Sequence, residues 1–354
     1  MKAYIRGIGM ISPQPTFDNS VFLEDIRSYD KRMLSSVEPD YKEFIKPIQL
    51  RRMSRVLRMG VTAAGICLRD AGVEMPDAII TGTGLGMMED TEKFLGSVID
   101  NEEKFLTPTS FIQSTHNTVG AHIAVMLGCN KYNFTYVHGP VSFESALLDS
   151  FMRLDENPEE NILCGGAEEI TDLHFRITDS AEFWKKEDVK SIELLKYKSE
   201  GTIAGEGSTF FLLNGKPSDK DYAVIRGVKI MYKADTVDLH QAAMDLLQEN
   251  GLGPADIDVL FLGMNGDIRY DRPYQQFLEK MPDDMTPAVF KHLCGEHYLA
   301  STFALWTAAR ALKNNHLPEA CLFKKHAKQP AKLENILIYN QYKNSDHSLI
   351  LVTK

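Results

Sequence analysis

The sequence carries several short motifs twice, in the same order. Ile5-Arg6-Gly7 recurs as Ile225-Arg226-Gly227, and segment 71–82, with glycines at 72 and 82, is matched by segment 250–263, with glycines at 251 and 263. In a third pair, His116 and His297 each precede an apolar helical stretch. The sequence distance between the two copies of a motif varies between about 180 and 220 residues, but the order of the motifs is the same in both copies. This is expected for a duplicated unit whose copies have received different insertions. The sequence therefore predicts two related halves.

Composition and element order place this duplication in the α/β class. The 354 residues suffice for about two domain-sized units, and 44% hydrophobic with 25% charged residues is typical of a folded chain. Apolar periodicity predicts helices at 51–71 and 301–312 and strands at 78–81, 162–166 and 348–352. This alternation favours packed α/β layers. Turn-forming residues at 214–221 predict a boundary near residue 218, with halves 1–218 and 219–354.

Charge and cysteine usage exclude several classes of partner. The formal net charge is −10 and no long basic tract occurs, which disfavours nucleic acid and anionic membranes. The five cysteines are odd in number and contain no C-x-x-C pair, which fits a reducing cytosol. Arg6 interrupts the only apolar stretch near the start, and no run of 18 apolar residues occurs. We expect a cytoplasmic protein with no nucleic-acid or membrane partner.

Two motifs could suggest a cofactor or a metal, and both are incomplete. Gly82-Thr-Gly-Leu-Gly86 follows a predicted strand but lacks the third glycine of a dinucleotide site. His292, Cys294 and His297 lie close in sequence but lack a second ligand pair. We therefore predict neither cofactor nor metal. Because glycine-flanked acids favour turns and close packing, structural roles are expected for Glu168, Glu169 and Glu206.

Four ordered segments carry a family resemblance that covers almost the whole chain. They are Ile5-Arg-Gly-Ile-Gly-Met-Ile-Ser-Pro13, Pro108-Thr-Ser-Phe-Ile-Gln-Ser-Thr-His-Asn117, Asn161-Ile-Leu-Cys-Gly-Gly-Ala-Glu-Glu169 and Gly201-Thr-Ile-Ala-Gly-Glu-Gly207. With them the chain resembles the β-ketoacyl-acyl carrier protein synthases, which have the thiolase fold. The resemblance implies a duplicated five-layer αβαβα architecture. It also implies a decarboxylative Claisen condensation that uses a cysteine nucleophile, two histidines and a lysine.

Three of the four chemical positions that the resemblance assigns are changed here. The family's T-A-C-x-S motif aligns with 137–145 and puts Pro140, which has no nucleophilic atom, at the cysteine position. Asn265 stands where the first histidine is expected, and an amide can donate a hydrogen bond but cannot transfer protons. Lys291 is retained, whereas Glu296 replaces the second histidine and, when ionised, would repel an enolate.

Nearby residues could substitute for the missing groups. His297 is one position beyond Glu296 and would reach inward if the local register slipped, although a structural histidine is the plainer interpretation. Cys294 is the other candidate, as a recruited nucleophile. The family's glycine-rich G-F-G-G loop aligns with 341–344, so Tyr342 would belong to a rebuilt gating loop.

Two further segments match surfaces of the family. The stretch with Thr109, Ser110, Phe111 and Gln113 corresponds to the part that crosses the dimer interface, where Phe111 would limit the partner's acyl tunnel; the alternative is an ordinary buried loop aromatic. The second segment is a basic patch on an otherwise acidic chain, in which positions 51, 55 and 58 would share one helical face. The patch could dock an acidic carrier protein, or it could be an ordinary solvated helix face. It comprises Arg51, Arg52, Arg55 and Arg58.

The pattern of changes predicts a non-condensing member of the family. We expect a chain-length-factor-like subunit of a type II fatty acid or polyketide (polyene) synthase, which pairs with a catalytic ketosynthase and with acyl carrier protein. A homodimer that binds acyl chains is a further possibility. The enzymatic alternative is an active 3-oxoacyl-carrier protein synthase or a malonyl decarboxylase, in which Asn265 and Lys291 stabilise the enolate and Cys294 or His297 is recruited.

Overall fold

The computed structural model describes residues 2–323, 329–330 and 332–354. Its strands form one continuous ten-stranded sheet in the order β3-β2-β4-β5-β1-β6-β10-β9-β7-β8. The bounds are β1 (Ala3–Ile11), β2 (Ala78–Gly82), β3 (Tyr132–Tyr136), β4 (Ile162–Glu168), β5 (Gly207–Asn214), β6 (Ala223–Tyr232), β7 (Val259–Leu262), β8 (Thr286–Val289), β9 (Asn335–Tyr342) and β10 (Asp346–Thr353). The predicted strands at 78–81, 162–166 and 348–352 are confirmed.

The strand order repeats within the sheet. In both halves the third strand pairs parallel with the second and the second parallel with the fourth, while the fourth and fifth and the fifth and first pair antiparallel. The two sets of strands are joined where β1 pairs with β6 across Ala3–Ile5 and Ala223–Ile225. Segment 215–222 connects the two sets. The division at residue 218 stays a prediction.

The repeated Ile-Arg-Gly motif coincides with a matching irregularity in the first strand of each set. The pairing of β1 with β5 shifts between Ile5 and Gly7, and β6 pairs with β10 through Ile225 and Gly227, so the arginine between them is left out each time. A Cβ at Gly7 would lie 2.6 Å from the backbone oxygen of Cys67. The glycine thus allows the following helix to pack directly on the strand.

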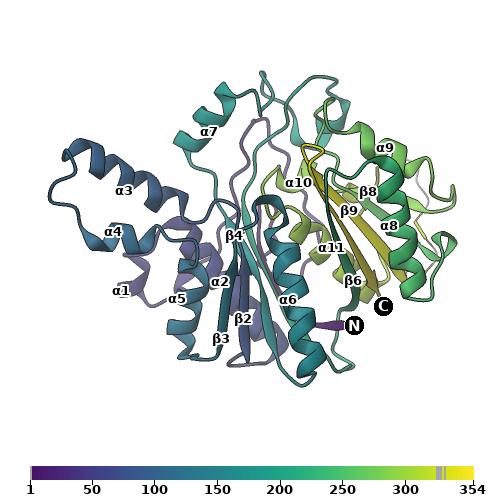
Figure 1. Cartoon of the computed structure of the whole chain (residues 1–354), viewed down its shortest axis with the longest axis horizontal. Coiled ribbons are helices and arrows are strands. Elements are labelled where there is room, and N and C mark those ends of the chain that lie inside the picture. Colours follow the sequence, from purple (N-terminus) through teal and green to yellow (C-terminus); the bar gives the residue numbers. More distant parts are fainter. Residues whose placement is uncertain (1, 324–328, 331) are drawn as a thin grey trace.

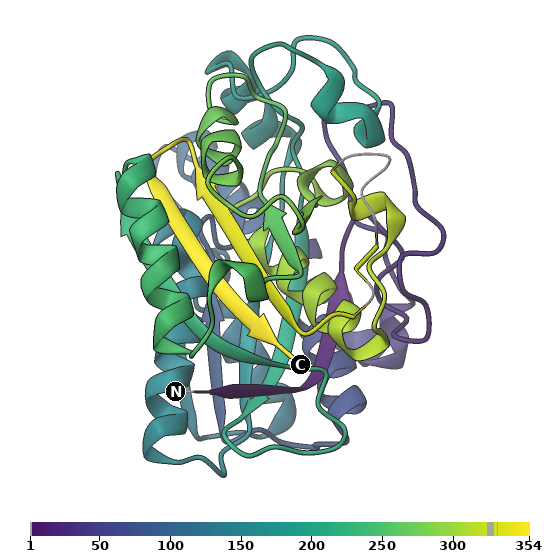
Figure 2. The ribbon, with the colours of Figure 1, turned by 90° about the vertical axis from the view of Figure 1, so that its right-hand side faces the viewer.

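Helices lie on both outer faces of the sheet and between its halves, which confirms the five-layer αβαβα architecture (Figure 1). Helices α2 (Arg55–Ala71) and α5 (Thr118–Leu127) cover the first outer face, α6 (Ser142–Glu156) and α11 (Ser301–Asn314) fill the middle, and α8 (Thr236–Glu249) and α9 (Arg272–Leu278) cover the other face. Neighbouring residues on β9 alternate between layers, since Ile336 and Ile338 join the middle core while Leu337 and Tyr339 join the outer one. The two ends of the chain come close together because β6 pairs with both β1 and β10 (Figure 2).

The remaining helices lie at the rim of the layers, except for α10, whose four residues are all buried. They are α1 (Pro47–Leu50), α3 (Met88–Asp100), α4 (Pro108–Gln113), α7 (Asp172–Ser180) and α10 (Lys291–Cys294). Helices α3 and α4 project from the body as an arm on the side of α5, and α7 stands near the carboxyl end of β4 (Figure 1). No helix in the described ranges is long and apolar enough to cross a membrane. The cytoplasmic location stays a prediction.

Two details of the sequence interpretation were wrong. The helix predicted from residue 51 begins only at Arg55, because Ser54 adopts an extended backbone (ψ 166°) and Arg51 and Arg52 lie in a turn. The match between His116 and His297 also fails. The helix after His116 covers an outer face, whereas α11 fills the middle layer, so the counterpart of α11 is α6.

Candidate functional site

Pro140 lies in the short 3-10 turn Gly139–Val141 that leads from β3 into α6. The hydroxyl of Ser142, the first residue of α6, lies 3.0 Å from the carbonyl of Thr83 and 2.8 Å from that of Gly139, and the backbone N–H of His138 donates to it at 2.8 Å. These contacts fix the start of the helix. A side chain at this turn lies at a helix N-terminus, where a thiol would be activated, but proline supplies neither a nucleophile nor an N–H.

Asn265 and Lys291 both contact Glu296, and Asn265 reaches it from a separate segment of the chain. The side-chain amide of Asn265 donates to Oε2 of Glu296 at 2.7 Å, and the ammonium of Lys291 donates to the same oxygen at 2.8 Å. The Lys291 and Glu296 side chains are only 1% and 7% exposed. The two donors that could stabilise an enolate oxygen therefore bind a carboxylate of the chain itself.

The loop that carries Asn265 is held by hydrogen bonds to its backbone. The N–H groups of Asn265 and Gly266 donate to the carboxylate of Asp271 at 3.0 and 2.9 Å, and the carbonyl of Asn265 accepts from Thr202 Oγ1 at 2.6 Å. Burial raises the pKa of Asp271 to about 6, despite these backbone donors. From the other side, the buried ammonium of Lys185 donates to the carbonyl of Gly266 at 2.8 Å. The amide of Asn265 is thus held in a fixed position.

The two candidate substitutes lie in different environments. Cys294 is fully buried in the middle core, where its thiol contacts the carbonyls of Gly295 and Phe290 at 3.3 and 3.7 Å, and burial raises its pKa. A buried thiol of this kind is inert. His297, in contrast, lines a pocket. Burial lowers the pKa of His297 to about 3, so its imidazole is neutral at pH 7, and its Nδ1 has no hydrogen-bond partner among the described residues.

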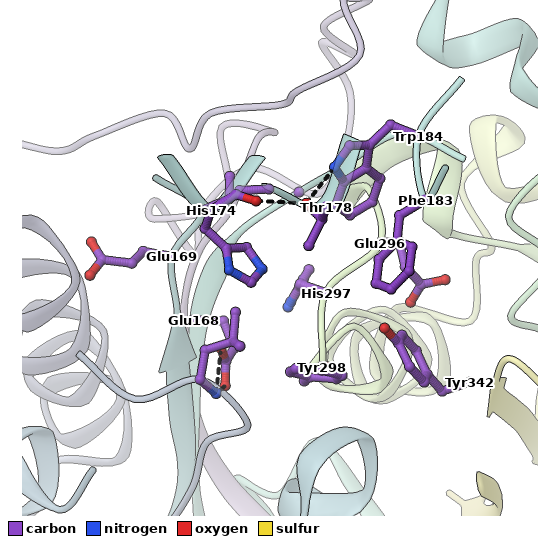
Figure 3. Close-up of a pocket in the computed structure, with 13 residues that line it drawn as sticks. Glu168, Glu169, His174, Thr178, Phe183, Trp184, Glu296, His297, Tyr298 and Tyr342 are labelled. Carbon is purple, nitrogen blue, oxygen red and sulfur yellow. Dashed lines mark hydrogen bonds between the residues drawn. The ribbon is translucent and has the colours of Figure 1, made fainter. Parts of the chain in front are cut away.

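The pocket beside His297 is walled by four aromatic side chains, Phe183, Trp184, Tyr298 and Tyr342, and is called the aromatic pocket below. Figure 3 shows their rings arranged around the space next to His297, with His174 opposite. The indole N–H of Trp184 donates to Thr178 Oγ1 at 2.8 Å, which fixes this ring. Residues of α7 and of the segment after it, which supply one wall, were missed by the sequence analysis, because they belong to no motif and meet the pocket only through folding.

Glu168 forms another wall of the pocket and bonds the glycine loop at 82–86. Its carboxylate accepts from Thr83 Oγ1 at 2.7 Å and from the backbone N–H groups of Gly84 and Leu85. A carboxylate of the chain thus binds the loop amides that a phosphate would use in a nucleotide site. Burial outweighs these hydrogen bonds and raises the pKa of Glu168 to about 7. Glu168, Glu169 and Glu206 all accept hydrogen bonds from other parts of the chain, which is consistent with the structural roles expected for them.

Tyr342, the predicted gating residue, ends β9 at a tight turn into β10. Lys343 and Asn344 adopt left-handed backbone conformations (φ 50° and 57°) without glycine, and Asn344 N donates to Gln341 Oε1 at 2.7 Å. The Tyr342 ring packs against Tyr298 with centroids 5.1 Å apart. Where the resemblance implies a glycine loop, this chain has a short hairpin turn that holds Tyr342 against the aromatic pocket.

The arginine patch is divided by the structure. Arg55 forms ion pairs of 2.5 Å with both Glu38 and Glu206, and Arg58 Nε donates to the carbonyl of Met53 at 2.9 Å. Arg51 and Arg52 are exposed in the turn before α2, so the shared helical face predicted for 51, 55 and 58 does not form. Two of the four side chains are therefore engaged within the chain.

Helix α4 carries Thr109, Ser110, Phe111 and Gln113 on the projecting arm. Phe111 is 57% exposed and packs on Phe94 of α3 with centroids 5.4 Å apart. The alternative of a buried loop aromatic is therefore wrong. An exposed phenylalanine on a projecting arm marks a surface that a partner could cover.

Residues 28–185 match the family model of the β-ketoacyl synthase N-terminal domain. The whole chain superposes on solved ketosynthases. The ishigamide ketosynthase/chain length factor gives a TM-score of 0.79 at 17% identity, covering 100% of this chain and 99% of that chain. The chain has the fold of the β-ketoacyl synthases. The predicted resemblance to this family is confirmed.

Further solved structures are similar over nearly their full length. The ketosynthase ApeO in complex with its chain length factor ApeC, from Xenorhabdus doucetiae, gives a TM-score of 0.73 at 16% identity, covering 99% of this chain and 98% of that chain. The AntDE:AntF structure, a type II polyketide acyl carrier protein with its hexaketide-bound ketosynthase, gives 0.77 at 12% identity, with 99% of each chain covered. A search of curated proteins finds no match. At these identities the likeness establishes the fold.

Proposed function

We propose that this chain is a non-condensing, chain-length-factor-like subunit that pairs with a catalytic ketosynthase and shapes its acyl tunnel. The observation that carries the proposal is the contact of Asn265 and Lys291 with Glu296. Condensation requires donors directed at a developing enolate oxygen and a nucleophile that accepts the acyl chain. Here both donors bind an internal carboxylate, and the nucleophile position holds Pro140.

The surface around β3 supports a partner. Strand β3 is an edge of the sheet, because among the residues that the structure describes it pairs with β2 alone, and Phe134 on it is 47% exposed. The neighbouring elements expose Val125 on α5 (77%) and Met152 on α6 (55%). An unpaired edge strand flanked by exposed apolar side chains favours association with another chain. The apolar residues of the α3–α4 arm would extend the same interface.

The nature of the partner is proposed from the solved relatives. Two structures with this fold pair a ketosynthase with a chain length factor, and a third contains an acyl carrier protein with its ketosynthase. We propose a heterodimer with a cysteine-bearing ketosynthase in a type II polyketide or fatty acid pathway, served by acyl carrier protein. The exposed Arg51 and Arg52 are the part of the arginine patch still free to contact an acidic carrier protein.

The enzymatic alternative draws little support from the geometry. Glu296 would place a carboxylate next to the carboxylate of a malonyl group, and like charges repel in a buried site. Cys294 lies in the core and contacts only backbone carbonyls in the hydrogen bonds that the structure describes. Decarboxylation or condensation through these residues would need them to rearrange.

The deciding experiment incubates the purified chain with malonyl- and acyl-carrier protein, alone and with a cysteine-bearing ketosynthase from the same source. Carbon dioxide release, acyl-protein mass and product length are followed together. We expect no turnover from the chain alone and longer or more uniform products when it is added to the synthase. Condensed product or an acyl adduct on the chain alone would overturn the proposal. Carbon dioxide release alone would indicate a decarboxylase.

A further inference from the structure

The aromatic pocket is walled by two pairs of rings that contact each other. The rings of Tyr298 and Tyr342 are tilted by 57° with centroids 5.1 Å apart, and those of Phe183 and Trp184 meet edge to face at 6.2 Å. Together they surround the space beside His297 (Figure 3). The faces of aromatic rings carry negative potential, and several rings around one space attract a cation.

The wall carries carboxyl groups and no cationic side chain among its described lining residues, although Glu296 is ion-paired with Lys291 and burial raises the pKa of Glu168 to about 7. Glu296 and Glu168 both line the pocket, and no Lys or Arg is found among its described lining residues. Glu296 receives its two hydrogen bonds from Asn265 and Lys291 on Oε2, so Oε1 takes no part in them. Burial lowers the pKa of His297 to about 3 and also lowers that of His174, so at pH 7 neither adds a positive charge.

An ammonium of the chain contacts one of these rings. The Nζ of Lys343 stands over the ring of Phe183, 2.7 Å from its centroid, and Lys343 lines the adjoining cavity rather than the aromatic pocket. Phe183 borders both cavities. The ammonium of Lys343 therefore already contacts an aromatic ring of the wall from the adjoining cavity. No cationic side chain is found among the described residues that line the aromatic pocket itself.

We infer that the aromatic pocket binds the ammonium head group of a small organic cation. The rings of Phe183, Trp184, Tyr298 and Tyr342 contact the head group, and Oε1 of Glu296, the oxygen that takes no part in the hydrogen bonds to Asn265 and Lys291, contacts it as well. The pocket rejects carboxylates such as malonate for the same reason. This inference goes beyond the proposed function and does not depend on it, because it concerns a ligand of the chain alone.

The test compares a cation with a neutral molecule of the same shape. Choline and 3,3-dimethyl-1-butanol differ only in a nitrogen for a carbon, and malonate serves as the anion. Binding to the full chain is measured by calorimetry and by the fluorescence of Trp184, with Trp184→Phe as the blank for the signal of Trp306. We expect choline to bind at least fivefold more tightly than the alcohol, and no binding of malonate.

Two variants assign the preference to the pocket. Phe183→Leu keeps an apolar wall without a π face, and Glu296→Gln removes the charge while keeping an amide oxygen as acceptor. Each is expected to reduce choline binding at least threefold and to leave binding of the alcohol unchanged, in protein whose circular dichroism matches the parent. Equal binding of choline and the alcohol, tighter binding of malonate, or no binding of choline overturns the inference.

Discussion

Lys291 and Glu296 form an ion pair of 2.8 Å in which both side chains are almost fully removed from solvent. Breaking a buried ion pair by removing one partner leaves an uncompensated charge, which typically costs about 3–5 kcal/mol. Lys291→Met is therefore expected to lower the free energy of unfolding by about 3 kcal/mol, as measured by urea denaturation. Lys291→Met with Glu296→Leu should recover much of that loss. If the double variant loses as much as the sum of the single ones, the pair is not coupled and the interpretation of the site changes.

Pro140 offers a direct test of how far the site is from a synthase. A thiol in the turn before α6 would lie at a helix N-terminus, which lowers its pKa. We expect Pro140→Cys to take up an acyl group from an acyl-carrier thioester, seen as an added mass on the intact protein. No condensation with malonyl-carrier protein should follow, because Asn265 and Lys291 remain bound to Glu296.

The control for this variant is Val141→Cys, which puts a thiol one residue further along the same turn. It should acylate more slowly, because only the preceding position corresponds to the family's nucleophile. A condensed product from Pro140→Cys alone would show that the donors of the site can be released by substrate. The non-condensing interpretation would then depend on the proline alone.

The sequence predicted the fold well because its signals are local. Paired glycines, strand patterns and the Ile-Arg-Gly repeat can each be recognised within a few residues, even where the contact that they permit, such as the packing of α2 on Gly7, is distant in sequence. The start of α2 was missed because the apolar periodicity continues through the turn at 51–54. The aligned positions Asn265, Lys291 and Glu296 were identified, but their contacts were not, because the turn at Gly295 that folds Glu296 back onto Lys291 and the loop that brings Asn265 to it are set by the tertiary structure. The same holds for Trp184 and the wall of α7, which carry no motif.

Glu168 should make stability depend on pH in a direction opposite to that of ordinary carboxylates. Its pKa is raised from 4.5 to about 7 by burial, so the folded state binds a proton that the unfolded state releases. The stabilisation is complete below pH 4.5 and is lost as the pH rises through about 7. Glu168→Gln is expected to show a smaller fall in melting temperature between pH 6 and pH 8 than the parent chain.

Other groups also titrate between pH 6 and pH 8. The quantity to compare is therefore the slope of the melting temperature against pH, and not the melting temperature itself. The pKa of Glu169 is likewise raised to about 7 by burial, and that of Asp271 to about 6. The histidines whose pKa values are lowered, such as His297, act with the opposite sign in the lower part of this interval, and because both chains contain them they cancel when the two slopes are compared. The matched control is Glu249→Gln on the exposed face of α8, which should leave the slope unchanged.

Phe134 on the edge strand β3 tests the interface with a partner. It is 47% exposed, and its ring lies 4.9 Å from that of Tyr136 on the same strand. Aromatic residues near the centre of an interface contribute much of the binding energy, and a charge on an edge strand prevents pairing. Phe134→Lys should weaken association with the ketosynthase at least tenfold in sedimentation or calorimetry, while the melting temperature of the isolated chain changes little. Val237→Lys, on the 67% exposed Val237 of α8 in the other half, should leave association intact. Equal effects of the two variants would place the interface elsewhere and would remove the strongest physical support for a partner at β3.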